Sequence, residues 1–233
     1  MNVSRATTKM TINIQNIVSC ANNELFNHFQ KVDNIKGLIS LYQSSQTECS
    51  RSAGLTPEVG SSRERDVIAS FLHNEGLTVV YDIPNKSEED VIVNTKKISI
   101  KHSSNKKNSC SGIKIVWTVD ESQRLKFVNK FVFSCDLLII FVRFDRDIVN
   151  GELVILYIEQ TTLIHQQQLC YIRNEEIFKC LSGNSRGIEL HKKFFDVIIN
   201  KALFHIAIKF KVPDHEKCDP IAKRVKYLNS IQK

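Results

Sequence analysis

The segment Asp136–Phe144 constrains the fold of this chain more than any other feature of the sequence. It reads Asp-Leu-Leu-Ile-Ile-Phe-Val-Arg-Phe, an almost continuous apolar run without alternating polar residues. The run is far shorter than the roughly 20 residues that a membrane-spanning helix needs. A strand that is apolar on both faces has to be covered on both faces, which is typical of a sheet packed between helices. We therefore expect a central strand here, in a core with helices on both sides.

The N-terminal part of the chain has a helical pattern. Apolar residues recur at helical spacing over 11–43, which predicts two or three helices. The polar stretch 44–56 indicates a loop. A further helix is expected to start at Thr56-Pro57 or after Gly60 and to end near Gly76, because threonine, proline and glycine favour those helix positions.

The remaining segments complete a mixed pattern of strands and helices. The expected fold class is α/β (mixed α+β), with a central mixed β-sheet flanked by helices. We expect a single domain, in which an N-terminal helical segment, residues 1–56, packs on a core formed by residues 57–233. Besides the central strand, we expect strands at 77–81, 90–94, 97–102, 113–119, 153–158, near 188 and at 204–210, and helices at 121–131 and 192–201.

Charge and composition favour a nucleic-acid-binding protein inside the cell. The formal net charge is +7, and the stretch 96–114 is rich in lysine and has no acidic residue. Basic side chains of this kind displace counterions from phosphates, although a solvated surface would explain them equally. The 7 cysteines form no Cys-x-x-Cys motif and no zinc-finger spacing, which favours reduced thiols. Without an apolar signal segment at the N-terminus, we expect a soluble, cytoplasmic protein with no membrane contact.

Glu64 is the first candidate functional residue. It lies four residues before Ile68 and seven before Phe71, two members of the apolar face of the helix expected after Gly60. It therefore points toward the buried side of that helix. A carboxylate directed at a core is costly unless a cation or a metal ion accompanies it. Taken alone, Glu64 is explained nearly as well by a surface charge between two arginines.

Asp90 and Lys101 lie on two neighbouring strands. Asp90 heads the strand at 90–94, and Lys101 follows on the strand at 97–102. A tight hairpin would bring both side chains to the same end of the sheet. Strand alternation places Ile98 and Ile100 on one face, and Ser99 and Lys101 on the other. A turn aspartate and a solvated strand lysine are the alternative readings of the two residues.

Phosphodiester hydrolysis requires the set of groups that these segments bring together. A hard divalent cation prefers oxygen ligands, which Glu64, Asp90 and the backbone carbonyl of Ile100 can supply. The cation activates a water molecule and polarises the phosphate. Lys101 can orient that water or stabilise developing negative charge. The sequence therefore predicts a Mg²⁺-dependent nuclease with Glu64, Asp90 and Lys101 as its catalytic residues.

The segment 60–144 resembles the PD-(D/E)XK nuclease superfamily. The likeness rests on Arg63-Glu64-Arg65, Asp90-Val91-Ile92-Val93 and Ile98-Ser99-Ile100-Lys101. Residues 60–81 also look like archaeal Holliday-junction resolvases, whereas spacing and size are most similar to small type II restriction endonucleases, ThaI in particular. This resemblance implies a restriction-endonuclease-like core with C-terminal DNA-recognition elements. It also implies a homodimer that cuts double-stranded DNA at a short palindromic sequence, within a restriction–modification system that includes a cognate DNA methyltransferase.

The sequence departs from the superfamily pattern at two positions. Glu89 stands where a proline usually precedes the aspartate, and Ser99 stands where a second acidic residue usually lies two before the lysine. Another carboxylate is then expected to take the place of the missing acid. Glu64 is the candidate for that role, with Glu58 and Glu121 as reserves.

Three segments are candidate DNA contacts. Asn184 and Arg186 can form bidentate contacts with adenine and guanine edges, although an ordinary polar turn explains them as well. By resemblance to ThaI, Leu55 or Val59 is expected to wedge between bases from the minor groove. The segment after the lysine-bearing strand offers polar groups for phosphates and base edges, with a solvated loop or a half-buried histidine as the alternative: His102, Ser103, Ser104, Asn105, Lys106, Lys107 and Lys114.

Two other functions remain open from the sequence alone. A structure-selective nuclease, such as a Holliday-junction resolvase, would use the same catalytic residues on branched DNA. The long flanking segments 1–56 and 145–233 argue against it, because they exceed what a minimal resolvase needs. A non-catalytic DNA-binding protein with a degenerate nuclease fold is the other alternative, and Ser99 is the residue that keeps it open.

Overall fold

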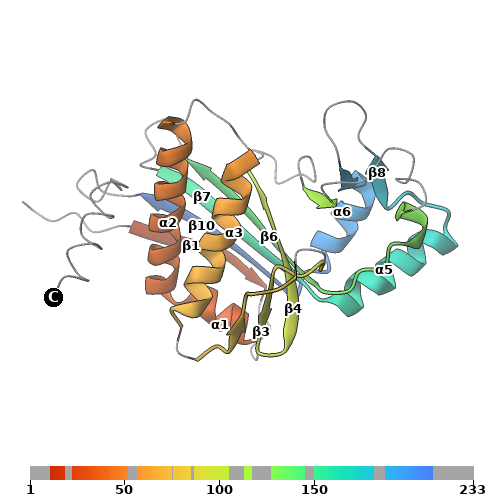
Figure 1. Cartoon of the computed structure of the whole chain (residues 1–233), viewed down its shortest axis with the longest axis horizontal. Helices are drawn as coiled ribbons and strands as arrows, with labels where there is room; N and C mark the ends of the chain where they lie inside the picture. Colours follow the sequence, from red (N-terminus) through yellow and green to blue (C-terminus); the bar gives the residue numbers. More distant parts are fainter. Residues whose placement is uncertain are drawn as a thin grey trace, which may run out of the picture.

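A computed structural model describes residues 11–18, 23–51, 57–74, 76–84, 87–104, 113–116, 127–144, 150–180 and 187–211. Its helices and strands follow one another along the chain as Figure 1 shows. The strands are β1 (Thr11–Val18), β2 (Val79–Val80), β3 (Val91–Val93), β4 (Lys96–Ser103), β5 (Lys114–Val116), β6 (Asp136–Phe144), β7 (Asn150–Ile158), β8 (Phe178–Cys180), β9 (Ile188–Leu190) and β10 (Phe204–Lys211). The helices are α1 (Glu24–Gln30), α2 (Val32–Arg51), α3 (Pro57–Leu72), α5 (Gln160–Ile172) and α6 (Lys192–Ile199).

A mixed sheet forms the centre of the described structure. Its seven strands lie in the order β1-β10-β7-β6-β4-β3-β2. The pairing of β4 with β6 is parallel, whereas the other pairings in this sheet are antiparallel. The strand expected at Asp136–Phe144 is β6, which lies in the middle of the sheet and is buried from Asp136 to Val142. The predicted central strand is therefore confirmed.

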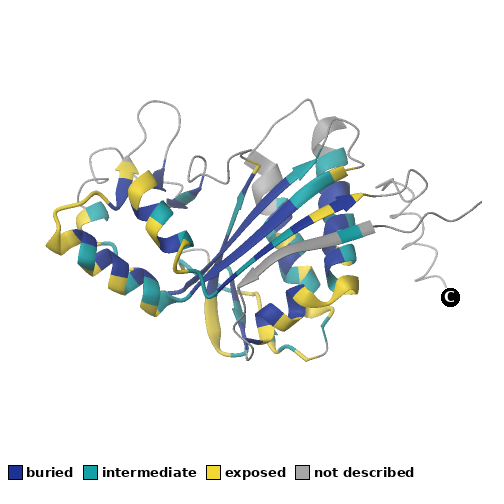
Figure 2. Cartoon of the chain, turned by 180° about the vertical axis from the view of Figure 1, so that it is seen from behind, coloured by how far each residue is buried: buried dark blue, intermediate teal, exposed yellow. Residues whose placement is uncertain are grey.

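Each face of the sheet has its own hydrophobic core. On one face, Ile98, Ile100 and Leu138 pack under α1, α2 and α3, which together form the helical layer. On the other face, Leu137 and Ile139 pack against α5, α6 and a second sheet of order β5-β9-β8. Figure 2 shows the buried strands of the large sheet with helices on either side. The alternation along β6 thus places successive side chains in two different cores, whereas β4 contributes Ile98 and Ile100 to the core under the helical layer.

The N-terminal segment differs from the helical expectation. Residues 11–18 form β1, which pairs antiparallel with β10 from Thr11↔Lys211 onward, so the helix expected there is wrong. The isoleucines at positions 12 and 14 also alternate, and β10 offers a free edge that the local pattern does not reveal. The helices expected after residue 23 are confirmed as α1 and α2. Asn23 starts α1, where its side chain accepts hydrogen bonds from the backbone N–H groups of Leu25 and Phe26.

The expected loop at 44–56 is wrong over its first half, because α2 continues to Arg51. Ser45 is buried there and donates a hydrogen bond to Asp66 of α3 at 2.6 Å. Packing between the two helices thus outweighs the low helix propensity of the polar stretch. The next helix, α3, begins at Pro57 as expected and ends at Leu72, four residues before Gly76. None of the described helices is both long and apolar enough to cross a membrane.

Candidate active site

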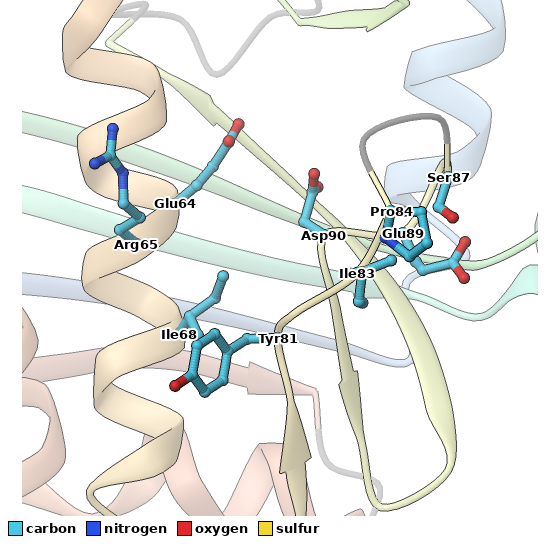
Figure 3. Close-up of a pocket in the computed structure, with 9 residues that line it drawn as sticks. All are labelled: Glu64, Arg65, Ile68, Tyr81, Ile83, Pro84, Ser87, Glu89 and Asp90. Atoms are coloured by element: carbon cyan, nitrogen blue, oxygen red, sulfur yellow. The ribbon is translucent and has the colours of Figure 1, made fainter.

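Three elements bring Glu64, Asp90 and Lys101 together. Glu64 lies on α3, Asp90 directly precedes β3, and Lys101 lies on β4. Pairing between β3 and β4 ends at Val91↔Ile98, so beyond Ile98 none of the described strands lies beside β4 on that side. Figure 3 shows the carboxylates of Glu64 and Asp90 facing each other across this opening. The convergence expected from the sequence is therefore present in the structure.

The side chain of Asp90 takes the place of the missing strand neighbour. Its Oδ2 accepts hydrogen bonds from the backbone N–H of Ile100 at 2.6 Å and from the Ser99 hydroxyl at 3.3 Å. The same oxygen forms an ion pair with Nζ of Lys101 at 3.4 Å. The side chain of Asp90 is 29% exposed and that of Lys101 is 11% exposed. Within the described part of the chain, these contacts leave Oδ1 of Asp90 for another ligand. The departure at Ser99 thus supplies a donor that orients Asp90 instead of a second acid.

The backbone carbonyl of Ile100 points toward the same edge. The N–H and C=O of one strand residue lie on the same side of the strand, and alternate residues repeat that direction. The carbonyl of Ile98 accepts a hydrogen bond from the backbone N–H of Asp90 at 2.9 Å. The backbone N–H of Ile100 donates to the carboxylate of Asp90. The carbonyl of Ile100 therefore faces the opening beside Asp90. This direction supports its expected use as a metal ligand.

The charge on Glu64 is unfavourable in the protein without a cation. Burial raises the pKa of Glu64 from 4.5 to about 7, and the nearby charge of Asp90 adds to that effect, while Lys101 and Arg65 oppose it. Two carboxylates that face each other in a partly buried site form a favourable environment for a divalent cation. The donors are carboxylate and carbonyl oxygens, which are the ligands that a hard cation such as Mg²⁺ prefers. Among the described residues, no group of three or more His, Cys, Asp or Glu side chains is arranged to hold a metal ion.

Replacing Glu64 by glutamine is expected to stabilise the metal-free protein more at pH 9 than at pH 5. Because the folded-state pKa of Glu64 is raised, the folded protein binds this proton more tightly than the unfolded chain. Wild-type stability therefore falls as the pH rises from about 4.5 through 7, whereas glutamine does not titrate. The difference in the free energy of unfolding should grow by on the order of 2–3 kcal/mol over that range.

Chemical denaturation in EDTA at several pH values measures this difference. Asp82→Asn is the matched control, because it removes an exposed carboxylate that forms no ion pair within the described part of the chain. A stability difference between Glu64→Gln and wild type that stays constant from pH 5 to pH 9 would contradict the raised pKa.

A cavity of about 290 Å³ opens beside the two carboxylates. Besides Glu64 and Asp90, the side chain of Glu89 borders it, but Glu89 points away from the other two acids in Figure 3 and pairs with Lys97 at 3.1 Å. A backbone hydrogen bond and Lys97 lower the pKa of Glu89, which marks it as a structural carboxylate. The reserve acids, the side chain of Glu58 and Glu121, lie outside the described residues.

Two cavity residues were not singled out from the sequence. Arg65 and Tyr81 line the cavity together with Ile68. Arg65 directly follows Glu64 on α3, so its position near the site could have been inferred from the sequence of that helix. Tyr81 lies just after the short strand β2, and nothing in the local sequence indicates that its ring stays exposed.

The candidate DNA contacts have different surroundings. His102 is directed toward the helical layer, where its Nε2 lies 2.8 Å from the hydroxyl of Tyr42. Burial lowers the pKa of His102, as do the charges of Arg63 and Lys101, which favours the alternative of a half-buried structural histidine over a phosphate contact. Ser103 is buried, Ser104 exposed and Lys114 half-buried. The other candidates lie outside the described residues: Asn105, Lys106, Lys107, Asn184, Arg186, Leu55 and the side chain of Val59.

Comparisons with known proteins identify the family of the chain and agree with its fold. The family model described as restriction endonuclease ThaI matches residues 25–219. A solved structure of a restriction endonuclease in complex with substrate DNA is similar to the chain, with a TM-score of 0.66 and 22% sequence identity. That match covers 89% of this chain and 100% of the other, and it shows a shared fold, which confirms the expected restriction-endonuclease-like core. No curated protein matches the chain.

Proposed function

Because the chain belongs to the ThaI restriction endonuclease family, we propose that Glu64, Asp90 and Lys101 carry out its cleavage of DNA. The protein is a type II restriction endonuclease, a hydrolase that acts on phosphodiester bonds. Its proposed substrate is double-stranded DNA with a short, palindromic recognition sequence. The observation that carries this proposal is the meeting of two carboxylates and a lysine at the open edge of β4, beside a cavity.

A divalent metal ion is the cofactor that the family implies, and we propose that it is Mg²⁺. Glu64, Asp90 and the carbonyl of Ile100 would hold it, because these oxygens share one opening and the raised pKa of Glu64 indicates a carboxylate that lacks a neutralising partner. When bound, Mg²⁺ lowers the pKa of a water molecule and polarises the phosphate. Membership in this family favours a restriction endonuclease over the junction-resolvase and non-catalytic alternatives.

The protein's own residues position the reacting groups. Asp90 holds Nζ of Lys101 in place through Oδ2 and at the same time fixes the backbone of Ile100. Lys101 can then orient the attacking water and offset negative charge that develops on the phosphate. Ser99 restrains Asp90 through its hydroxyl, which keeps Oδ1 of Asp90 directed at the opening. By analogy with the family, the product carries a 5′-phosphate.

The remaining assignments follow from the family and the charge of the chain. We propose a homodimer, because two copies of one site can cut both strands of a palindrome. A cognate DNA methyltransferase would protect the host sequence, and both proteins would work in the cytoplasm. The net charge of +7 supports contact with DNA phosphates. The pairing of β1 with β10 supports our proposal that residues 1–56 and 57–233 form a single domain.

Incubating the purified protein with unmethylated phage DNA tests the activity. With Mg²⁺ we expect discrete fragments on a gel, because a sequence-specific nuclease cuts at fixed positions. With EDTA we expect intact DNA, and added Mg²⁺ in excess should restore the fragments. Fragments in EDTA, or a smear in place of bands, would contradict the proposal, and cleavage confined to branched DNA would identify a structure-selective nuclease instead.

A further inference from the structure

We propose that Arg65 and Tyr81 form a strand clamp that holds the DNA backbone beside the cleavage site. In this clamp, Arg65 binds the phosphate next to the one that is cut, and Tyr81 contacts the adjoining sugar and phosphate. The inference rests on the proposed catalytic function of Glu64, Asp90 and Lys101. It adds two positioning residues that take no part in the bond-breaking step.

The two arginines beside Glu64 have different environments. Successive helix residues are about 100° apart, so Arg63 and Arg65 lie on nearly opposite sides of α3. Arg63 is 5% exposed and donates a hydrogen bond to Oε1 of Gln46 on α2 at 2.7 Å. Arg65 is exposed and lines the cavity. Arg63 therefore joins two helices, whereas Arg65 borders the cavity with an exposed side chain.

Charge gives Arg65 a specific task. Three acidic side chains line the cavity, and of these Glu89 is paired with Lys97. Without a bound cation, the carboxylates of Glu64 and Asp90 repel a DNA phosphate. Lys101 is only 11% exposed and is engaged with Asp90. Among the lining residues that the structure describes, Arg65 is the one basic side chain. A guanidinium matches the geometry of a phosphate through two parallel N–H donors, so Arg65 offsets the repulsion on the α3 side of the site.

Tyr81 provides a second contact on the same wall. Its side chain is 58% exposed, so the ring is accessible to a ligand. In Figure 3 its ring lies beside Ile68, on the α3 side of the cavity and below Arg65. An exposed ring with a hydroxyl at its tip suits a deoxyribose and its phosphate, because it combines an apolar surface with a hydrogen-bonding group. Arg65, Ile68 and Tyr81 thus line one cavity together with Glu64.

Salt-dependent DNA binding tests the role of Arg65. Binding of a labelled duplex containing the recognition site is measured in EDTA by fluorescence anisotropy at several salt concentrations. Losing one phosphate contact should reduce the slope of log K against log salt by about 0.9, so Arg65→Ala should show this change and a roughly 5- to 20-fold weaker affinity. Arg65→Lys should restore the slope, because lysine keeps the charge. Lys31→Ala, which removes an exposed cation that does not line the cavity, is the charge-matched control.

Tyr81 is tested in the same assay. Tyr81→Ala should weaken binding several-fold without changing the salt slope, because it removes no charge, and Tyr81→Phe should retain most of the affinity that the ring contributes. Thermal unfolding of each variant checks that the fold is kept. If Arg65→Ala and Tyr81→Ala bind like Lys31→Ala, the clamp is wrong.

Cleavage assays separate failure of the clamp from failure of the catalytic site. Wild-type binding by Arg65→Ala together with inactive Asp90→Asn would overturn the clamp alone. A reduced salt slope for Arg65→Ala together with active Asp90→Asn would overturn the proposed catalytic residues and leave the DNA contact in place. Under the clamp, Arg65→Ala should also raise KM more than it lowers kcat, since its contact forms already in the bound ground state.

Discussion

Replacing Asp90 by asparagine is expected to lower the rate of DNA cleavage by about 10³-fold or more, while the fold and DNA binding are kept. Asparagine has the same shape, but it removes the negative charge that holds a cation and pairs with Lys101. Oδ2 of Asp90 also accepts the N–H of Ile100 and the Ser99 hydroxyl, so an amide oxygen can retain part of the local structure. Loss of activity should therefore come from the missing charge and not from unfolding.

Single-turnover cleavage of a duplex with the recognition site measures this effect, with thermal unfolding and binding in EDTA as checks on fold and affinity. Asp33→Asn is the matched control, because Asp33 is an almost fully exposed acid in the first turn of α2, away from the cavity. The control should cleave DNA within about twofold of wild type. Asp90→Asn that cuts at the control's rate would exclude Asp90 from the active site.

Replacing Lys101 by methionine is the second large effect, and we expect a loss of about 10²- to 10³-fold in cleavage rate. Methionine keeps the packing of the aliphatic stem but removes the ammonium group that lies 3.4 Å from Asp90. Lys101 also lowers the pKa of Glu64, so its removal should raise that pKa further above 7. Because Glu64 binds metal in its charged form, the residual activity should need a higher pH than wild-type activity.

A pH–rate profile of Lys101→Met between pH 6 and pH 10 checks both parts of this prediction. Lys96→Met is the control on the same strand, since Lys96 pairs with Glu159 and does not line the cavity. The control should keep both the rate and the pH profile of wild type. A Lys101→Met enzyme with wild-type kcat at pH 8 would show that Lys101 has no part in catalysis.

The sequence was sufficient where a local pattern had only one compatible environment. A doubly apolar run such as Asp136–Phe144 can be stable only between two covering layers, and β6 occupies that place. The alternation of Ile98 and Ile100 against Ser99 and Lys101 predicted which face of β4 is core, and the two isoleucines lie there. Glu64 was recognised as inward-directed because its helix spacing to Ile68 and Phe71 excludes the outer face.

Contacts between distant segments decided the rest. Helical and strand spacing were both compatible with residues 11–18, and pairing with β10, at the other end of the chain, selected the strand. The helix over the polar residues after position 43 depends on Ser45 meeting Asp66, which no local propensity encodes. The buried orientation of His102 depends likewise on Tyr42 of α2.

The sequence by itself therefore determined the class of fold, the central strand and the three residues of the candidate active site. Only the tertiary structure decided how those residues work together: that Oδ2 of Asp90 binds the open edge of β4, that the carbonyl of Ile100 faces the same opening, and that Asp90 helps to raise the pKa of Glu64. The physical reason is the distance along the chain over which each interaction acts. Periodicity and residue chemistry act within a few neighbouring residues, whereas strand order, burial and charge coupling depend on segments that meet only in the folded chain.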